Sequence, residues 1–348
     1  MMWMLAARLH RIGEKLRIDH VRVPSIGADD VLVDVRATGI CHSDINYRNG
    51  VAPVRKLPIT LGHEIAGVAA KVGHRVRKIR EGDRVCVHYI MHCRRCLFCR
   101  TNRENYCVRY QMMGKDIDGG LAEYVRVPAR SILKLPESIP FEQGAILGCA
   151  VSTAFHALRR GRVRVGETVA VFGVGGLGAH AVQLAAKIFK AGKVIAVDLL
   201  DEKLKLAQKL GAKEVVNAIS RDPAEVVKRI TGGNLADVVI DFVGHTKAIQ
   251  KAIGCVGKGG RLVLVGIGSR LVQISPYRTI IGKEMELVGV NDHLRSELAK
   301  LIELVSSGRM DLSRSVTHRV PLVDVNRGFQ ILQKNIGSPI RVVVEQGR

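Results

Sequence analysis

The sequence predicts an α/β protein in which a doubly wound parallel sheet of six strands is inserted into a β-rich domain. Three observations support this: a glycine-rich turn within 168–198, alternating strand and helix patterns after it, and short β-rich segments near both ends of the chain. A chain of 348 residues is long enough for two domains. We expect residues 1–150 and 291–348 to form the β-rich domain and residues 151–290 the inserted one.

The glycine-rich turn lies in the segment TVAVFGVGGLGAHAVQLAAKIFKAGKVIAVD, residues 168–198. A β-branched run at 168–172 enters a G-x-G-x-x-G turn, a helix-period segment follows to about residue 190, and a strand at 194–197 ends in an acid. This order and spacing are typical of a Rossmann unit, which binds a dinucleotide pyrophosphate at the helix N-terminus. The turn residues expected at the cofactor are Gly173, Gly175, Gly176, Leu177 and Gly178.

The acid at the end of that strand, Asp198, bears on which cofactor is bound. A carboxylate in this position accepts hydrogen bonds from a ribose diol and repels a 2′-phosphate. No arginine follows at once, because the next residues are LLDEK. We therefore expect NAD rather than NADP.

The pattern after this unit continues to alternate. Amphipathic helices are expected at 202–211 and 224–233, and further strands of the parallel sheet at 214–219, 236–244, 261–268 and 285–290. Short strands of the β-rich domain are expected at 29–39 and 82–90. The same pattern occurs again near the end of the chain, where a helix is expected at about 294–306 and a strand at 340–345.

Composition limits the possible functions. The sequence contains no apolar run of about 18 residues, so we expect no membrane span, and its start lacks a signal-peptide pattern, so we expect a cytoplasmic protein. The formal net charge is +22, from 54 Lys and Arg against 32 Asp and Glu. The basic residues are scattered and aromatic residues make up only 4%, which argues against nucleic acid as the partner.

Half of the eight cysteines fall in the segment HCRRCLFCRTNRENYC, residues 92–107. The spacing C-x2-C-x2-C-x7-C allows a loop to present four sulfurs tetrahedrally, as in a closed four-thiolate zinc site. An iron–sulfur cluster is the rival, but the fourth cysteine is distant and no Cys-Pro pair follows. We favour a structural zinc ion bound by Cys93, Cys96, Cys99 and Cys107.

A second set of metal-binding residue types is dispersed. Cys41 lies in GICHSD, His63 in LGHE and Cys149 in GCAVST. Two thiolates, one imidazole and an open position form a known type of catalytic zinc site. Each residue alone would more often be a packed core residue. The dinucleotide-binding unit that follows them in the sequence is what favours the interpretation as a zinc site.

Taken together, these motifs resemble the zinc-dependent medium-chain alcohol dehydrogenases along essentially the whole chain. GICHSD, LGHE, the four-cysteine segment, GCAVST and GVGGLG occur in that family's order and spacing. The resemblance implies a GroES-like catalytic domain, a catalytic zinc ion at Cys41, His63 and Cys149, and a structural zinc ion at the four clustered cysteines. It also implies reversible hydride transfer between an alcohol and NAD, giving an aldehyde or ketone.

The resemblance assigns further residues around the catalytic zinc. Glu64 corresponds to a glutamate behind the metal that can enter its coordination sphere. Asp44 corresponds to the carboxylate that orients the histidine ligand, and Ser43 to the hydroxyl that hydrogen-bonds the substrate oxygen. Tyr89 corresponds to an aromatic residue of the substrate pocket, although ordinary core packing explains it equally well.

For the cofactor, the resemblance assigns Thr153 and Arg341 to the nicotinamide ribose and pyrophosphate, and Lys203 to the adenine ribose. Asn46 departs from the family pattern, because many members have there a histidine that ends a proton relay. An amide cannot titrate, so the relay would end in water or in another base such as His42, which also corresponds to a position near the pyrophosphate. The simpler interpretation is that Asn46 only hydrogen-bonds the ribose.

Two alternative functions remain open. A polyol dehydrogenase of the same superfamily typically has glutamate as its third zinc ligand, and Cys149 argues against it. A zinc-stabilised nucleic-acid-binding protein is suggested only by the charge and the four cysteines. We further expect a homo-oligomer, a tetramer ahead of a dimer, assembled through the apolar strand at 285–290.

Overall fold

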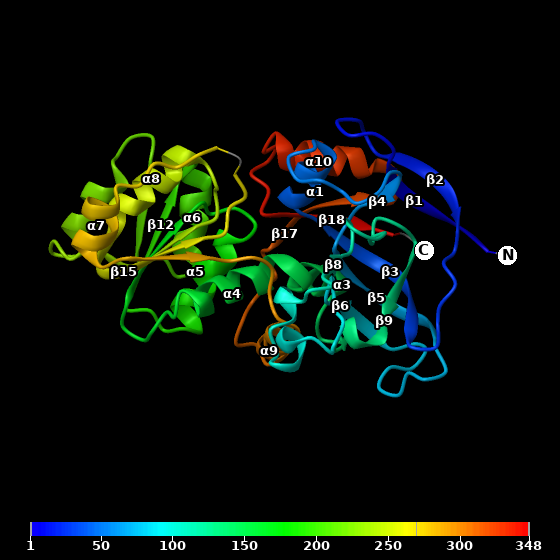
Figure 1. Cartoon of the computed structure of the whole chain (residues 1–348). Coiled ribbons are helices and arrows are strands. Elements are labelled where there is room, and N and C mark those ends of the chain that lie inside the picture. Colours follow the sequence, from blue (N-terminus) through cyan, green and yellow to red (C-terminus); the bar gives the residue numbers. More distant parts are fainter. Residues whose placement is uncertain (1, 269, 347–348) are drawn as a thin grey trace. The chain divides into compact units, whose positions relative to one another are not determined.

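The structure is a computed structural model that describes residues 2–268 and 270–346. The chain forms two compact units (Figure 1). The discontinuous unit comprises Met1–Ser152 and His293–Arg348, and the continuous unit comprises Thr153–Asp292. The boundaries expected after residues 150 and 290 each lie two residues before the observed ones.

The continuous unit contains a parallel sheet of six strands in the order β13-β12-β11-β14-β15-β16. The doubly wound parallel sheet expected from the sequence is therefore confirmed. Its strands are β11 (Thr168–Phe172), β12 (Lys193–Asp198), β13 (Glu214–Asn217), β14 (Ala236–Asp241), β15 (Val256–Leu264) and β16 (Glu286–Gly289). Its helices are α5 (Gly178–Lys187), α6 (Asp201–Leu210), α7 (Pro223–Ile230) and α8 (Thr246–Cys255), after α4 (Ser152–Arg160), which begins at the boundary.

The central strands are apolar without alternation because both faces of the sheet are covered. Every residue of 169–172 and 194–197 is at most 3% exposed, which is typical of a parallel sheet between helices. Helix α5 ends at Lys187, earlier than the expected residue 190, and Lys190 adopts a left-handed backbone conformation with φ +54°. Helix α8 was not expected from the sequence.

The discontinuous unit is built around a seven-stranded sheet of order β10-β6-β5-β3-β18-β17, with β9 paired to β3. Its strands are β3 (Asp30–Ile40), β5 (Glu64–Val72), β6 (Arg84–Val87), β9 (Tyr124–Pro128), β10 (Ile132–Lys134), β17 (Val316–Pro321) and β18 (Arg341–Glu345). Smaller sheets contain β1 (Trp3–Leu9), β2 (Arg17–Arg22) and β4 (Ile59–Thr60), and β7 (Ile90–Met91) with β8 (Gln111–Met112).

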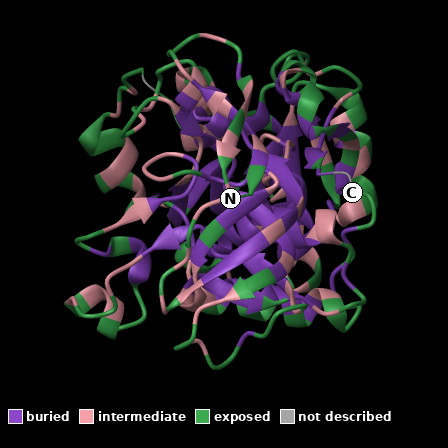
Figure 2. Cartoon of the chain, turned by 90° about the vertical axis from the view of Figure 1, so that its right-hand side faces the viewer, coloured by how far each residue is buried: buried purple, intermediate pink, exposed green. Residues whose placement is uncertain are grey.

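The end of the chain completes the sheet that its beginning starts. Strand β18 pairs with β3 in antiparallel orientation and β17 lies parallel to β18. Figure 2 shows the buried strands of this unit surrounded by exposed loops. Its helices are α1 (His42–Arg48), α2 (Leu97–Arg100), α3 (Phe141–Ile146), α9 (Arg295–Ser306) and α10 (Val325–Gln333). No helix in the described part of the chain has both the length and the apolar character needed to cross a membrane.

Candidate metal and cofactor sites

The four clustered cysteines converge in a small lobe, which we call the cysteine lobe and define as residues 92–109. Cys96 precedes the short helix α2, and Cys107 follows a 3-10 turn at Glu104–Tyr106. Sulfur–sulfur distances are 3.9 Å for Cys93–Cys99, 3.5 Å for Cys96–Cys99 and 4.0 Å for Cys96–Cys107. Backbone N–H groups donate hydrogen bonds to two of the sulfurs. The N–H of Cys96 donates to Cys93 Sγ at 3.4 Å, and the N–H of Cys93 donates to Cys107 Sγ at 3.2 Å.

These distances fit a zinc ion. A tetrahedron with Zn–S bonds of about 2.3 Å has edges of about 3.8 Å, and the three measured separations bracket that value. The thiols are free cysteines rather than disulfides. The lobe therefore has the ligand types and spacing of a closed structural zinc site.

The dispersed ligands also come together, although they come from three separate segments. Cys41 precedes α1, His63 directly precedes β5, which Glu64 begins, and Cys149 lies in a π-helical turn at Leu147–Val151. One ligand atom from each residue lies within 4.8 Å of the others, and all four residues are buried. A π-helical turn is frequent at functional sites because it redirects one side chain, and here that side chain is Cys149.

Asp44 lies behind the histidine, as expected. Its carboxylate accepts hydrogen bonds from the backbone N–H of Cys41 at 2.9 Å and of Gly62 at 3.2 Å. The same carboxylate also faces the ring of His63, with Asp44 Oδ1 at 3.4 Å from His63 Nδ1. Nε2 of His63 is buried and makes no hydrogen bond of good geometry to the described residues. This arrangement fits a metal ligand that uses Nε2 while a carboxylate orients its ring.

Electrostatics within the cluster favour a thiolate at Cys41. The hydrogen bond with Cys149 is the largest influence and lowers the pKa of Cys41 well below its usual value, and His63 lowers it further. The same hydrogen bond and burial raise the pKa of Cys149. Burial lowers the pKa of His63, but the charge of Asp44 and the contact with Cys41 outweigh it and raise that pKa well above normal. A metal ion needs deprotonated ligands, and this network already favours loss of one thiol proton.

Glu64 and Arg341 form a buried ion pair beside this cluster. Burial raises the pKa of Glu64 to about 7, against the opposing charge of Arg341. Gly39 faces Glu64 across β3 and β5, and a Cβ there would lie 2.0 Å from Glu64 Oε2, so only glycine fits. The side chain of Arg341 is 2% exposed and pairs with Glu64. Its expected contact with the cofactor stays a prediction.

The residues that follow Cys41 occupy helix α1. The hydroxyl of Ser43 lies 3.7 Å from Cys41 Sγ, so it is beside the metal-binding cluster. His42 is exposed and Asn46 is half-buried. The expected contact of Ser43 with a substrate oxygen stays a prediction.

Tyr89 is buried and packs against the ligand His63, with ring centroids 5.0 Å apart in an edge-to-face contact. Its ring also contacts His293 at 5.1 Å and stacks on His88 at 6.2 Å. Tyr89 is therefore both packed in the core and next to the metal-binding cluster, and its expected place in a substrate pocket stays a prediction. Sequence reasoning missed both histidines, because neither lies in a recognisable motif, and only their burial in the fold identifies them.

The glycine turn has the geometry that its motif predicts. Gly173 has φ +83°, and a Cβ on Gly178 would lie 1.8 Å from the carbonyl oxygen of Gly173. A Cβ on Gly175 would meet nothing within 4 Å, so open space lies over that residue. Nδ1 of His180 donates a 2.6 Å hydrogen bond to the carbonyl of Gly176. The turn leaves room for a pyrophosphate at the start of α5.

The remaining cofactor candidates lie in the continuous unit. Asp198 ends β12, and Lys203 lies half-buried in the first turn of α6. Thr153 is buried in α4. Cys86 and Cys255 are fully buried, and burial raises the pKa of each to about 12, as for small apolar core residues.

Comparison with known proteins identifies relatives along the whole chain. Residues 27–137 match the family model "Alcohol dehydrogenase GroES-like domain", and residues 176–307 match "Zinc-binding dehydrogenase". An alcohol dehydrogenase of Geobacillus stearothermophilus is 35% identical over 95% of this chain and 96% of its own length. The sorbitol dehydrogenase of Bacillus subtilis (strain 168) is 35% identical over 99% of this chain and 98% of its own length.

A solved structure is similar over the same extent. The alcohol dehydrogenase of the archaeon Aeropyrum pernix superposes with a TM-score of 0.91 and 36% sequence identity, covering 98% of this chain and 100% of that one. Both family models, the curated relatives and the two cysteine-containing clusters agree with one another. The chain belongs to the zinc-dependent medium-chain dehydrogenases, the oxidoreductase family of the alcohol dehydrogenases.

Proposed function

We propose that this protein oxidises a small alcohol to an aldehyde or ketone, reversibly, with NAD as the hydride acceptor. The observation that supports this most strongly is the buried cluster of Cys41, His63 and Cys149, which offers two thiolates and one imidazole. We assign the catalytic zinc to these three residues, with Glu64 behind it, and the structural zinc to the cysteine lobe. The resident groups supply Lewis-acid activation of a hydroxyl or carbonyl and, in NAD, a carrier for the hydride.

The residues of the chain have separate tasks in this proposal. Asp44 holds His63 in one ring orientation through its contact with Nδ1. The Ser43 hydroxyl, next to Cys41, takes the hydrogen bond from the substrate hydroxyl and passes the proton on. Asn46 cannot accept that proton, so we assign it a hydrogen-bonding role and leave water or exposed His42 as the next acceptor.

The same proposal assigns NAD to the glycine turn of the continuous unit. Asp198 at the end of β12 supports NAD over NADP, because its negative charge repels a 2′-phosphate. We assign the pyrophosphate to the turn at 173–178, where Gly175 leaves open space. Lys203, Thr153 and Arg341 remain candidates for the ribose and nicotinamide ends.

A polyol dehydrogenase is the second candidate. Glu64 offers a carboxylate oxygen within the same 4.8 Å cluster as the other ligands, and a sorbitol dehydrogenase is among the relatives at 35% identity. Against it, Cys149 already supplies a thiolate as the third ligand. The substrate, rather than the fold, separates the two functions.

We also propose a homo-oligomer, tetramer ahead of dimer, in a cytoplasmic setting. Six thiols assigned to zinc must stay reduced, which is usual in the cytosol. The support for assembly is the outer strand β16, which pairs on one side with β15 and leaves Leu287 exposed.

The test is a panel of primary, secondary, cyclic and polyhydric alcohols, assayed for NADH formation with NAD and with NADP. We expect turnover of a monohydric alcohol with NAD. Cys149→Ala should abolish turnover, whereas Cys255→Ala, at a core cysteine outside both clusters, should retain it. Turnover confined to polyols would favour the second candidate, and full activity of Cys149→Ala would contradict the site assignment.

A further inference from the structure

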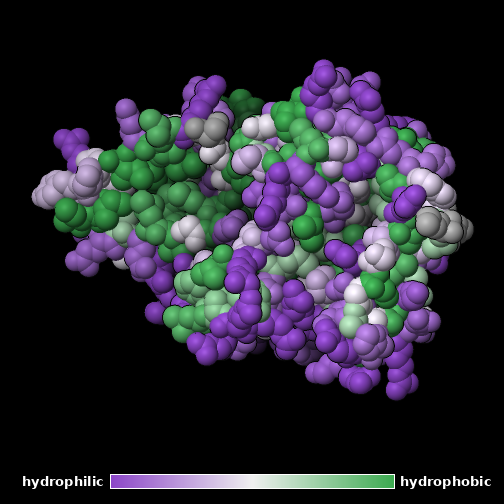
Figure 3. All heavy atoms as spheres, turned by 45° about the vertical axis from the view of Figure 1, so that its right-hand side comes forward, coloured by the Kyte–Doolittle hydropathy of each residue, from purple (hydrophilic) through white to green (hydrophobic). Residues whose placement is uncertain are grey.

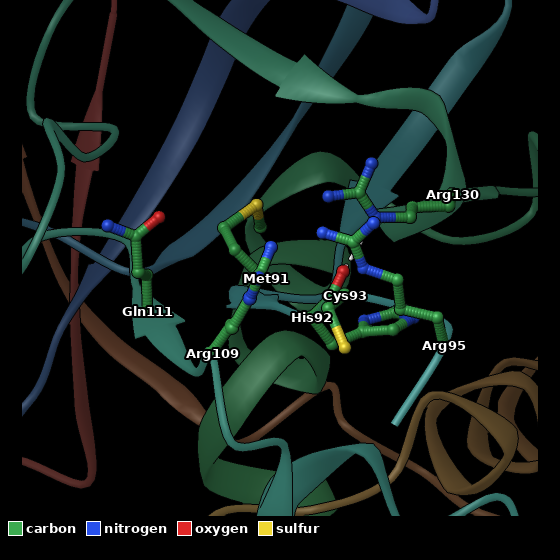
Figure 4. A pocket seen from close by; sticks show the side chains of 7 residues that line it. All are labelled: Met91, His92, Cys93, Arg95, Arg109, Gln111 and Arg130. Carbon is green, nitrogen blue, oxygen red and sulfur yellow. Dashed lines mark hydrogen bonds between the residues drawn. The ribbon is translucent and has the colours of Figure 1, made fainter. Parts of the chain in front are cut away.

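A pocket with three arginines opens beside the cysteine lobe, in the discontinuous unit. We call it the arginine pocket. Its volume is about 310 Å³, and it is lined by Met91, His92, Cys93, Arg95, Arg109, Gln111 and Arg130. Figure 4 shows the guanidinium groups of Arg95 and Arg130 turned toward each other, with Arg109 beside Met91. The pocket belongs neither to the catalytic cluster nor to the glycine turn.

One of the three arginines is fixed through its side chain, and the other two lie next to cysteines of the lobe. Nε of Arg130 donates a 3.2 Å hydrogen bond to the carbonyl of His92, which fixes this side chain at the pocket wall. Arg109 follows Cys107 by two residues, and its N–H donates to Cys107 Sγ at 3.3 Å. Arg95 lies between the ligands Cys93 and Cys96. The backbone positions of Arg95 and Arg109 are therefore tied to the cysteine cluster.

No carboxylate among the described residues forms an ion pair with Arg95, Arg109 or Arg130. The cysteine lobe contains five arginines and a single acid, Glu104. That carboxylate is buried and accepts a 2.7 Å hydrogen bond from the N–H of Arg295, outside the pocket. The pocket therefore brings three positive charges together with no carboxylate of the described residues paired to them.

An alternative explanation for the arginines is that they balance the negative charge of the zinc site. Four thiolates and one Zn²⁺ carry a net charge of about −2, which the arginines would partly offset. The hydrogen bonds to the sulfurs described above, however, come from backbone N–H groups of Cys93, Cys96 and Arg109, not from guanidinium groups. The three arginines that line the pocket carry a charge of +3, one more than the two negative charges of the zinc site. Glu104 is not among the lining residues, so one positive charge at the pocket is left without a partner there.

We propose that the arginine pocket binds a phosphate group, free or on a small molecule. Guanidinium groups that face one another repel unless an anion lies between them, and their planar fork matches the oxygens of a phosphate. Gln111 adds a neutral hydrogen-bonding side chain to the wall. A volume of about 310 Å³ is at the lower end for ligand pockets, so it suits phosphate or diphosphate rather than a whole dinucleotide.

The experiment is a calorimetric titration of the two-zinc protein with inorganic phosphate and with diphosphate at low ionic strength. NAD is kept saturating so that the pyrophosphate position of the cofactor is already filled. We expect saturable binding of one ligand per chain, tighter for diphosphate. Arg130→Gln should weaken it about tenfold or more, as expected for loss of a charged hydrogen-bonding partner, and Arg130→Lys should fall between the two.

Arg77→Gln is the matched control, because Arg77 is exposed, lies in the same unit and is absent from the pocket. It removes the same charge and should leave the affinity within about twofold, as distant charges are screened. Zinc content and dehydrogenase turnover verify that each variant is folded. If Arg130→Gln fails to fold, Arg95→Gln serves as the second variant and should weaken binding in the same way. Absence of saturable binding, or equal affinity in Arg130→Gln and wild type, would overturn the proposal.

Discussion

The carboxylate of Asp198 accepts a 2.6 Å hydrogen bond from the backbone N–H of Val174, the residue between the first two glycines of the turn. Its other oxygen accepts hydrogen bonds from Leu199 at 2.7 Å and Leu200 at 3.1 Å. One side chain thus ties the end of β12 to the proposed pyrophosphate turn. The residue expected to select the cofactor also supports the loop that we propose to bind it.

Asp198→Gly should weaken NAD binding and shift relative preference toward NADP. The variant removes both the ribose acceptor and the repulsion of a 2′-phosphate, and a lost hydrogen bond to a charged group corresponds to about a tenfold to hundredfold change. Fluorescence titration of both cofactors measures it. Asp201→Asn, three residues further on, removes a nearby charge and should leave the preference unchanged. An unaltered NAD to NADP ratio in Asp198→Gly would mean that the adenosine end is recognised elsewhere.

Elemental analysis of the purified protein should give about two zinc ions per chain, one for each ligand set. Cys96→Ser should lower this to about one and markedly reduce the melting temperature, because structural zinc contributes directly to folding. The protein that remains folded should keep its chemistry. Cys255→Ala is the control and should retain both ions. A fully stable Cys96→Ser protein with selectively lost turnover would reverse the assignment of the two sites.

Asp44→Asn tests the role of the carboxylate behind His63. The amide keeps a similar shape near the N–H groups of Cys41 and Gly62 but loses the negative charge that faces Nδ1. We expect a loss of about tenfold to hundredfold in zinc affinity or turnover, measured by chelator competition and steady-state kinetics. Asp34→Asn, on β3 and paired with Arg36, is the matched control. Unchanged zinc affinity and turnover would show that the charge of Asp44 is dispensable.

Local patterns were enough to predict the sheet, the glycine turn and the grouping of the four clustered cysteines, whereas Cys41, His63 and Cys149 were brought together only by the dinucleotide-binding unit that follows them and by the family resemblance. Gly178 illustrates why, because its small size is required by a contact with Gly173 only five positions away. Contacts between distant segments could not be predicted in the same way. The pairing of Glu64 with Arg341, the approach of His293 to Tyr89 and the entry of Arg130 into a pocket of the cysteine lobe depend on how the strands assemble.

His88 should make stability depend on pH. Burial lowers the pKa of His88 to about 3, with the positive charges of His92 and Arg295 adding to it against a hydrogen bond to the carbonyl of His293. Below about pH 6.5 the unfolded chain takes up a proton at this residue, whereas the folded chain does so only near pH 3. Proton uptake by the unfolded chain favours unfolding. The free energy of unfolding is therefore unaffected by His88 above about pH 6.5, and it decreases as the pH falls toward 3, by at most about 1.4 kcal/mol per pH unit.

The measurement is the free energy of unfolding in urea between about pH 4 and pH 7. His88→Gln should give a shallower slope than wild type, because glutamine takes up no proton in either state. The exposed His20 provides the control variant His20→Gln, which should keep the wild-type slope. Parallel curves for wild type and His88→Gln would exclude His88 as the source of the slope.

The last prediction concerns assembly of the subunits. Strand β16 lies at the outer edge of the parallel sheet, and Leu287 on it is 43% exposed. Tyr277 and Ile281, in the segment before β16, are also exposed. Figure 3 shows hydrophobic side chains gathered on the surface of the continuous unit. An open apolar edge favours pairing with a second copy. The formal charge of +22 per chain opposes association, but screening at physiological salt limits this repulsion to about 8 Å.

We therefore expect light scattering to give the mass of a homo-oligomer, tetramer ahead of dimer, that becomes more stable as salt is added. Leu287→Glu should dissociate it, since the variant places a charge on the apolar edge that pairing would bury. Val165→Glu, at an exposed valine in the same unit and outside the sheet, should leave the mass unchanged. Monomers of the wild type at moderate salt would contradict assembly. An intact oligomer in Leu287→Glu would exclude β16 as the contact, because an unpaired carboxylate buried between two apolar strands costs more than such an edge contributes.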